Sequence, residues 1–193
     1  MKKLISVVCL ICSLFCISLS SAFAAEKDCY EQVLNKVNEA YGTNLGYVKV
    51  NESEISLEDY TNLAKKIAAD QRRLLDYLES KENEMMDISE NEAALYSTIT
   101  KTRTKPTWSF PSNITITATY NVYDGVRVSS AWGARLGLTA GGYLNTQILN
   151  ESGPSYSLLD GGRTAGVKYT ATVKINGATF SNSTLYTEFG AGD

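Results

Sequence analysis

Residues 165–178, with the sequence AGVKYTATVKINGA, decide the fold of this chain. Apolar side chains occupy every second position up to Ile175, and Gly, Lys or Thr fills the positions between them. Alternation with a period of two predicts a β-strand with one buried and one solvent-exposed face. Asn176-Gly177 is a strong signal for a two-residue hairpin, so we expect residues 178–189 to return as a second strand.

The same pattern occurs upstream, where residues 114–122 alternate apolar side chains with Thr and Asn. Asp124-Gly125 then predicts a hairpin turn, with residues 126–132 as the return strand. A further strand is expected over residues 143–149. Six or seven antiparallel strands with turn signals about every 8–12 residues predict a sandwich-like all-β domain.

The last predicted strand places a carboxylate where a regular ladder would bury it. If residues 178–189 alternate without interruption, Glu188 shares the core-facing side with Phe180, which is costly unless the carboxylate is paired. One extra residue between Ser181 and Thr184 would turn Glu188 to the other face. We therefore expect a β-bulge in this segment.

The first half of the chain carries the signals of two helices. The first has a capping-box spacing at Asp28 and Glu31 and a stop signal at Gly42. The second covers residues 57–78 and has an apolar stripe that only Gln71 interrupts. The stripe must be buried, either on the first helix or the β domain, or against a partner helix in a dimer.

Residues 1–24 have the composition of a secretory signal peptide. Two lysines precede an apolar run, and Ala22-Phe23-Ala24 forms a small-x-small cleavage site. The competing interpretation is an uncleaved membrane anchor, because residues 4–25 carry no charge over a length that spans a bilayer. We expect cleavage, which gives a protein without a membrane span that is secreted or associated with the cell surface.

Composition divides the rest of the chain, because the charged residues are concentrated before Pro106 and later segments are rich in Ser, Thr and Gly. The expected class is α+β, with a two-helix segment followed by the sandwich-like domain. The expected parts are a signal peptide (1–24), a helical segment (25–84), a polar linker (85–105) and a β-sandwich domain of six or seven antiparallel strands (106–193).

The absence of His excludes much catalytic and metal chemistry, including every Ser-His and Cys-His nucleophile. Asp124 and Asp160 each precede Gly in a predicted turn, where Asp is common for backbone reasons, so they do not indicate an acid–base pair. A net charge of −3 argues against nucleic-acid binding. We therefore expect no enzymatic activity, no metal and no cofactor.

Candidate binding residues lie around a glycine-rich stretch that follows Trp132. Trp132 and Tyr143 are of residue types that often anchor contacts, and Arg127 and Arg135 can pair with acidic groups or stack on rings. The glycines predict a loop or an irregular edge with accessible backbone. The competing interpretation is that Trp132 is the core tryptophan of the β domain.

Cys29 is the one cysteine that remains once residues 1–24 are removed. A single cysteine in an exported protein suggests an intermolecular disulfide or a free thiol. The alternative is an inert, half-buried side chain in the first helical turn.

The segments LDGGRTA (159–165) and LYTEF (185–189) lie towards the end of the predicted β domain. Together with the signal peptide and the charged helical segment, they give a layout that resembles small exported proteins of Gram-positive bacteria with a C-terminal β domain of unknown function. The resemblance implies export and assigns no activity.

Two classes of function fit these observations. The first is a non-enzymatic binding protein, secreted or at the cell surface, whose ligand is a protein or a glycan. The alternative is an oligomerising, pore-forming protein whose Thr-rich amphipathic strands enter a membrane.

We predict that the exported protein begins at Ala25, because the cleavage signature ends at Ala24. Intact-mass measurement of the secreted protein checks this. A membrane-retained species that keeps residues 1–24 would contradict it.

Overall fold

The computed structural model describes residues 28–51, 53–82, 98–109, 113–139 and 145–193. These residues form two helices and seven strands: α2 (Cys29–Tyr41), β1 (Gly46–Tyr47), α3 (Leu57–Lys81), β2 (Thr98–Pro106), β3 (Ile114–Tyr123), β4 (Arg127–Leu138), β5 (Thr146–Leu159), β6 (Thr164–Ile175) and β7 (Ala178–Gly190).

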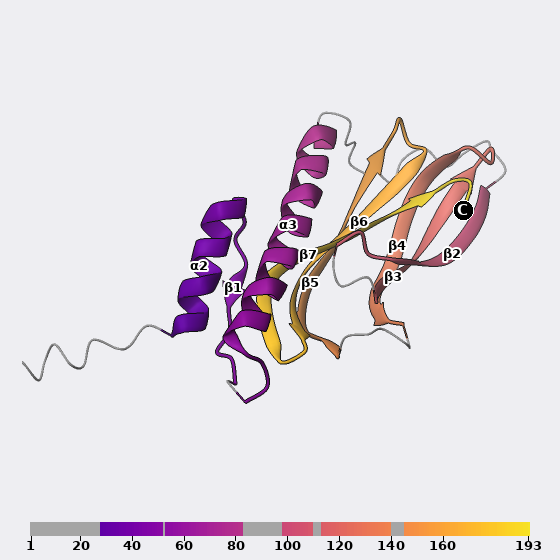
Figure 1. Ribbon diagram of the computed structural model, residues 1–193. Coiled ribbons are helices and arrows are strands. Elements are labelled where there is room, and N and C mark those ends of the chain that lie inside the picture. The colour runs from indigo at the N-terminus through magenta and orange to yellow at the C-terminus, as the bar shows by residue number, and fades with distance from the viewer. Residues whose placement is uncertain (1–27, 52, 83–97, 110–112, 140–144) are drawn as a thin grey trace, which may run out of the picture.

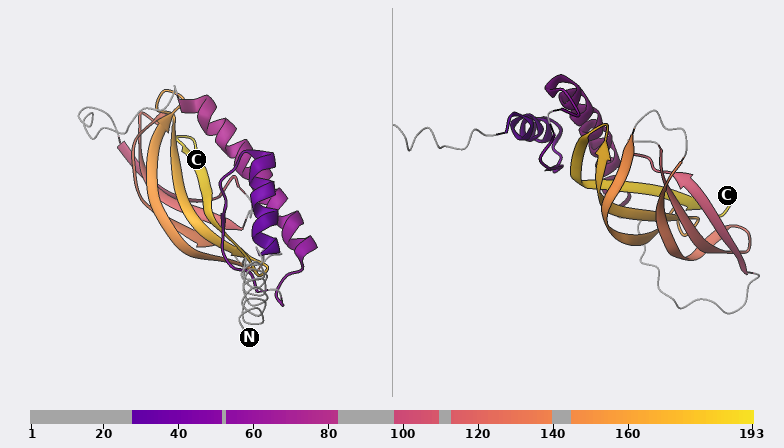
Figure 2. Two further views of the ribbon diagram at one scale, coloured as in Figure 1. Left: turned by 90° about the vertical axis from the view of Figure 1, so that its left-hand side faces the viewer. Right: turned by 90° about the horizontal axis from the view of Figure 1, so that it is seen from below.

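All strand pairs are antiparallel, and the strands form two sheets with the orders β1-β7-β6-β5 and β2-β3-β4. The helices lie at one side of the molecule and the sheet β2-β3-β4 at the other (Figures 1 and 2). The predicted α+β class is confirmed, and the fold is mostly β with a small helical part.

Both predicted helices are present and begin at side-chain caps. Asp28 accepts a hydrogen bond from the Tyr30 N–H (3.0 Å) at the start of α2, and Gly42 ends this helix in the left-handed conformation, at φ 63°. Ser56 caps α3, which runs to Lys81, slightly past its predicted end. Neither of these helices is long and apolar enough to cross a membrane.

The apolar stripe of α3 is buried within the chain. Tyr60 stacks on Phe180 of β7, with ring centroids 5.4 Å apart, and meets the Tyr30 ring of α2 edge-on at 5.1 Å. Further along the helix, Leu74 packs against residues of β5 and β7. These contacts bury the middle of the stripe inside the chain, and a dimer through residues 57–78 stays a prediction.

Gln71, the polar residue within the stripe, is 3% exposed and binds the edge of β7. Its amide donates to the Thr184 carbonyl at 2.8 Å and accepts the Thr184 N–H at 2.8 Å. The Ser109 hydroxyl also donates to this carbonyl (3.0 Å), and the main-chain N–H of Trp108 donates to the Tyr186 carbonyl (2.8 Å). These groups take the place of a neighbouring strand, because β1 pairs only with the first part of β7.

The predicted bulge in β7 is confirmed. Val173 of β6 pairs with Phe180, whereas Ala171 pairs with Ser183, so β7 contains one more residue than β6 between the two pairs. The extra residue falls beside Asn182, whose φ is 58°.

Beyond the bulge, the burial of β7 follows the prediction. Leu185, Thr187 and Phe189 are at most 1% exposed, and Glu188 points to the opposite face. That face is not open to water, because Tyr77 of α3 lies over it and hydrogen-bonds Glu188. Glu188 is therefore half-buried rather than fully solvated.

One hydrophobic core joins the helices to both sheets. β3 contributes its whole inner face to this core, and residues of α2, α3, β6 and β7 belong to the same buried cluster. The helical segment is therefore part of the packing of the β domain and not a spacer attached to it.

Strand β2 lies in the segment predicted as a polar linker (85–105). Residues Thr98–Pro106 pair with β3 along their whole length, so the linker prediction is wrong from Thr98 onwards; its earlier part lies outside the described residues. The strand was not predicted from the sequence because cations occupy its inward positions, where apolar residues are usual. Lys101, for example, donates to the main-chain oxygens of Ala191 (2.7 Å) and Asp193 (2.8 Å).

Strands β4 and β5 are longer than predicted because each passes through glycine with a change of register. β4 continues through the glycine-rich stretch by a bulge at Gly133, whose φ is 60°, so as far as Leu138 this stretch is an irregular edge strand, the second of the two predicted forms, and not a loop. In β5 the register shifts between Ser152 and Ser155.

We predict that Gln71→Ala destabilises the protein by about 2 kcal/mol, because it leaves main-chain groups of Thr184 with fewer partners in a buried place. For a chain of this length the melting temperature should fall by about 4–8 °C. Thermal unfolding followed by circular dichroism measures the change. Asn62→Ala, on the exposed side of the same helix, is the matched control, and equal melting temperatures for the two variants would refute the prediction.

Candidate functional site

The outer face of the sheet β2-β3-β4 carries three of the four residues expected to bind. Directly opposed residues in an antiparallel ladder share a face, and Thr117 and Thr119 alternate with the core residues of β3. Trp132 pairs with Thr119 and Arg135 with Thr117, so both side chains point outward. Arg127 lies further along the same face, at the start of β4.

The bulge in β4 brings Trp132 and Arg135 to one face. Side chains three positions apart on a regular strand point to opposite faces. The extra residue beside Gly133 shifts the alternation by one position, so Trp132 and Arg135 point to the same face. Ala131 and Leu136 pack against the core instead. Trp132 is 42% exposed, so the interpretation as a core tryptophan is wrong.

Hydrogen bonds between facing side chains hold this outer face in a fixed arrangement. Three pairs link β2 to β3: Thr100 with Asn121 (2.8 Å), Thr102 with Thr119 (3.0 Å) and Thr104 with Thr117 (2.7 Å). Bonded cross-strand pairs of this kind stabilise a sheet and restrict their side chains. The face is therefore polar and pre-ordered.

The outer face also carries positive charge on a chain with a net charge of −3. Arg127 donates to the Tyr123 hydroxyl at 3.4 Å. Arg135 has no ion pair with any described residue, and no carboxylate occurs among the residues of this face in the three paired strands. Guanidinium groups in this setting can bind acidic groups or stack on rings.

The remaining candidates are not part of this face. Tyr143 lies outside the described residues. Cys29 is exposed at the start of α2 with a free thiol, so the interpretation as a half-buried side chain is wrong. Its pairing with another molecule stays a prediction.

A second group of functional side chains forms where α3 crosses β7. The hydroxyls of Tyr77 and Tyr186 both donate to Oε1 of Glu188, each at 2.7 Å. The Trp108 ring packs edge-on against both tyrosine rings, with centroid distances of 5.0 and 5.2 Å. Burial, reinforced by the carboxylate, raises the pKa of both tyrosines well above the usual value. Both therefore remain hydrogen-bond donors at neutral pH.

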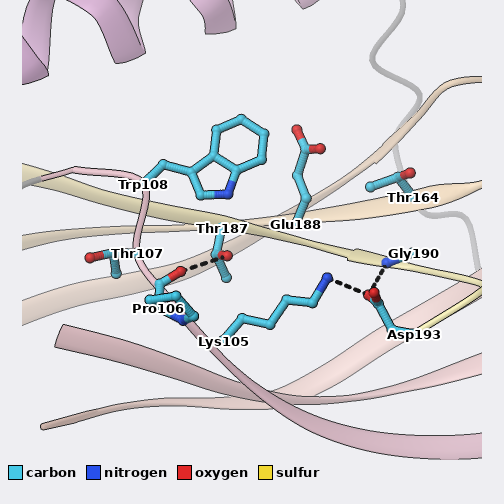
Figure 3. A pocket seen from close by; sticks show the side chains of 9 residues that line it. All are labelled: Lys105, Pro106, Thr107, Trp108, Thr164, Thr187, Glu188, Gly190 and Asp193. Atoms are coloured by element: carbon cyan, nitrogen blue, oxygen red, sulfur yellow. Dashed lines mark hydrogen bonds and ion pairs between the residues drawn. The ribbon is translucent and has the colours of Figure 1, made fainter. Parts of the chain in front are cut away.

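A cavity of about 360 Å³ lies beside this cluster (Figure 3). On one side the Lys105 ammonium pairs with the Asp193 carboxylate at 2.5 Å. The complete lining is Lys105, Pro106, Thr107, Trp108, Thr164, Thr187, Glu188, Gly190 and Asp193. Sequence patterns did not reveal this site, because its side chains come from distant segments and Trp108 belongs to no periodic pattern.

The described residues contain no cluster of acidic or cysteine side chains placed to hold a metal ion. Asp124 and Asp160 lie in two different turns, with φ values of 50° and 53°, and Asp160 pairs with Lys81 at 3.0 Å. They do not form a carboxylate pair of the kind that catalyses glycoside hydrolysis.

No protein-family model matches this chain, and no curated protein or solved structure is significantly similar to it.

We predict that iodide strongly quenches the fluorescence of Trp132 in a Trp108→Phe variant, because the indole is exposed. Iodide should also quench it more than caesium does, since Arg127 and Arg135 attract anions. Replacing Arg135 with Gln should reduce the difference between the two quenchers. A Trp132 signal that neither ion quenches would contradict the exposed position.

Proposed function

We propose that this protein is a non-enzymatic binding protein, secreted or at the cell surface, that holds a protein or glycan ligand bearing acidic groups. The ligand lies on the outer face of β2-β3-β4. The observation that carries this proposal is the exposed indole of Trp132, which shares one polar sheet face with Arg127 and Arg135.

Tryptophan and arginine are the residue types that most often supply binding energy at interfaces. Here both are on strands whose positions are fixed by the ladder, and the neighbouring threonines are bonded in pairs. A pre-ordered surface loses little conformational entropy when a ligand binds. The absence of carboxylates among the residues of this face favours an acidic ligand over a basic one.

The two-sheet fold and the predicted signal peptide are both compatible with this function. Two antiparallel sheets around a shared core support a sandwich-like β domain, a scaffold type that presents binding surfaces on its faces and loops. Export is supported by the composition of residues 1–24.

Retention on immobilised polymers tests the proposal. The probes are polygalacturonate as an acidic glycan, polyglutamate as an acidic polypeptide and dextran as a neutral glycan. We expect retention on at least one acidic polymer but not on dextran, and a loss of about tenfold in affinity for Trp132→Ala and for Arg135→Ala. Lys168→Ala removes an exposed cation on β6 and is the matched control.

Two results would overturn the proposal. One is the absence of retention on both acidic polymers, or equal retention of the Trp132, Arg135 and Lys168 variants. The other is release of dye from vesicles of phosphatidylcholine and phosphatidylglycerol by the unmutated protein, which would favour the membrane-active alternative.

A further inference from the structure

The carboxylate of Glu188 has one oxygen engaged and one available. Tyr77 and Tyr186 both bond Oε1, whereas no described residue bonds Oε2 or forms an ion pair with Glu188. A carboxylate has acceptor sites on both oxygens. Glu188 therefore keeps unused acceptor capacity at the cavity that it lines.

The same cavity offers a flat apolar surface and additional polar groups. The Trp108 ring is 48% exposed, and its indole N–H bonds to no described residue. Figure 3 shows the Glu188 carboxylate beside this indole, with Thr164 and the Lys105–Asp193 pair on other sides of the cavity. Binding sites for small ligands combine an apolar wall with a few fixed polar groups in this way.

The charged groups around the cavity already have partners, which suits a neutral polar ligand. The Lys105 ammonium is paired with the Asp193 carboxylate at 2.5 Å, and the Glu188 carboxylate accepts from two tyrosine hydroxyls, so a neutral ligand can bind without disrupting either arrangement. A ligand with several hydroxyls suits both, because each hydroxyl can donate to Glu188 or accept from Lys105 and the indole N–H.

We propose that this cavity is a second binding site, separate from the outer face of β2-β3-β4, and that it takes a neutral saccharide. One apolar face of the sugar ring packs on the Trp108 indole. A sugar hydroxyl donates to Oε2 of Glu188, and a second hydroxyl accepts from Lys105.

Tyr77 is a positioning residue for this site. Its hydroxyl holds Oε1 of Glu188, and its ring supports the Trp108 ring at 5.0 Å. Because Tyr77 belongs to α3, the helical segment completes the cavity that the β strands begin.

Fluorescence of Trp108 tests the proposal in the full chain with Trp132→Phe, which leaves Trp108 as the one tryptophan. The probes are glucose, galactose, N-acetylglucosamine and cellobiose, with choline and acetate as charged controls. We expect a saturable change in emission with at least one sugar and none with choline or acetate. In the same background, Glu188→Gln should weaken sugar binding about tenfold, whereas Glu151→Gln, at an exposed site on β5, should not change it.

Two further measurements keep the result independent of folding defects. Tyr77→Phe should weaken binding by a few fold although Trp108 remains, and the circular dichroism melt of each variant reports whether it is folded. Saturation-transfer NMR on the unmutated chain should show transfer to C–H protons of the bound sugar. The proposal is overturned if no sugar gives a saturable signal by either method, if only choline or acetate binds, or if folded Glu188→Gln and Glu151→Gln bind sugar equally.

Discussion

The open edge of strand β7 is the constraint on which the rest of the structure depends. On the edge that faces away from β6, β7 pairs with β1 only at Phe180 and Ser181, so the main-chain groups of Thr184 and Tyr186 on this edge meet no strand. A buried main-chain group without a partner costs about 1–3 kcal/mol, and an exposed edge invites pairing with other chains. Gln71 of α3 and residues 107–109 supply the missing partners. The edge therefore fixes both the position of α3 across the sheet and the path of residues 107–109 after β2.

The same contacts build the cavity at Glu188. The bulge at Asn182 places Tyr186 and Glu188 on the face that α3 covers. The hydrogen bond from the main-chain N–H of Trp108 to Tyr186 brings the Trp108 side chain to the same face. The carboxylate then meets two tyrosine hydroxyls, one of them from the helix. The contacts that cover the open edge of β7 have thus placed the Trp108 ring, the Glu188 carboxylate and the Lys105 ammonium around one cavity.

The sequence predicted those features that depend on local pattern or on burial. Alternation and the Asn-Gly turn located β6 and β7, and the cost of burying Glu188 located the bulge between them. Features that depend on partners distant in sequence were not predicted. Gln71 resembled a defect in an apolar stripe, because its partner Thr184 is far away in sequence. Strand β2 alternates Thr with Lys and Arg, so it lacks the apolar half of the pattern, and its cations are satisfied by residues near 191–193. At Gly133, glycine predicted a loop or an irregular edge; its positive φ allows a bulge in the edge strand β4, and the sequence did not reveal that this bulge turns Trp132 and Arg135 to one face.

Strand β2 is also the element that the two proposed sites share. Successive side chains of a strand point to opposite faces. Thr104 therefore faces outward, bonded to Thr117 in the row that ends at Arg135, whereas Lys105 faces inward and lines the cavity with Glu188. A change of register in β2 by one residue would exchange these roles and disrupt both surfaces together. Its Thr side chains and its cations serve different faces of the same sheet, which explains why a strand can persist here without an apolar face of its own.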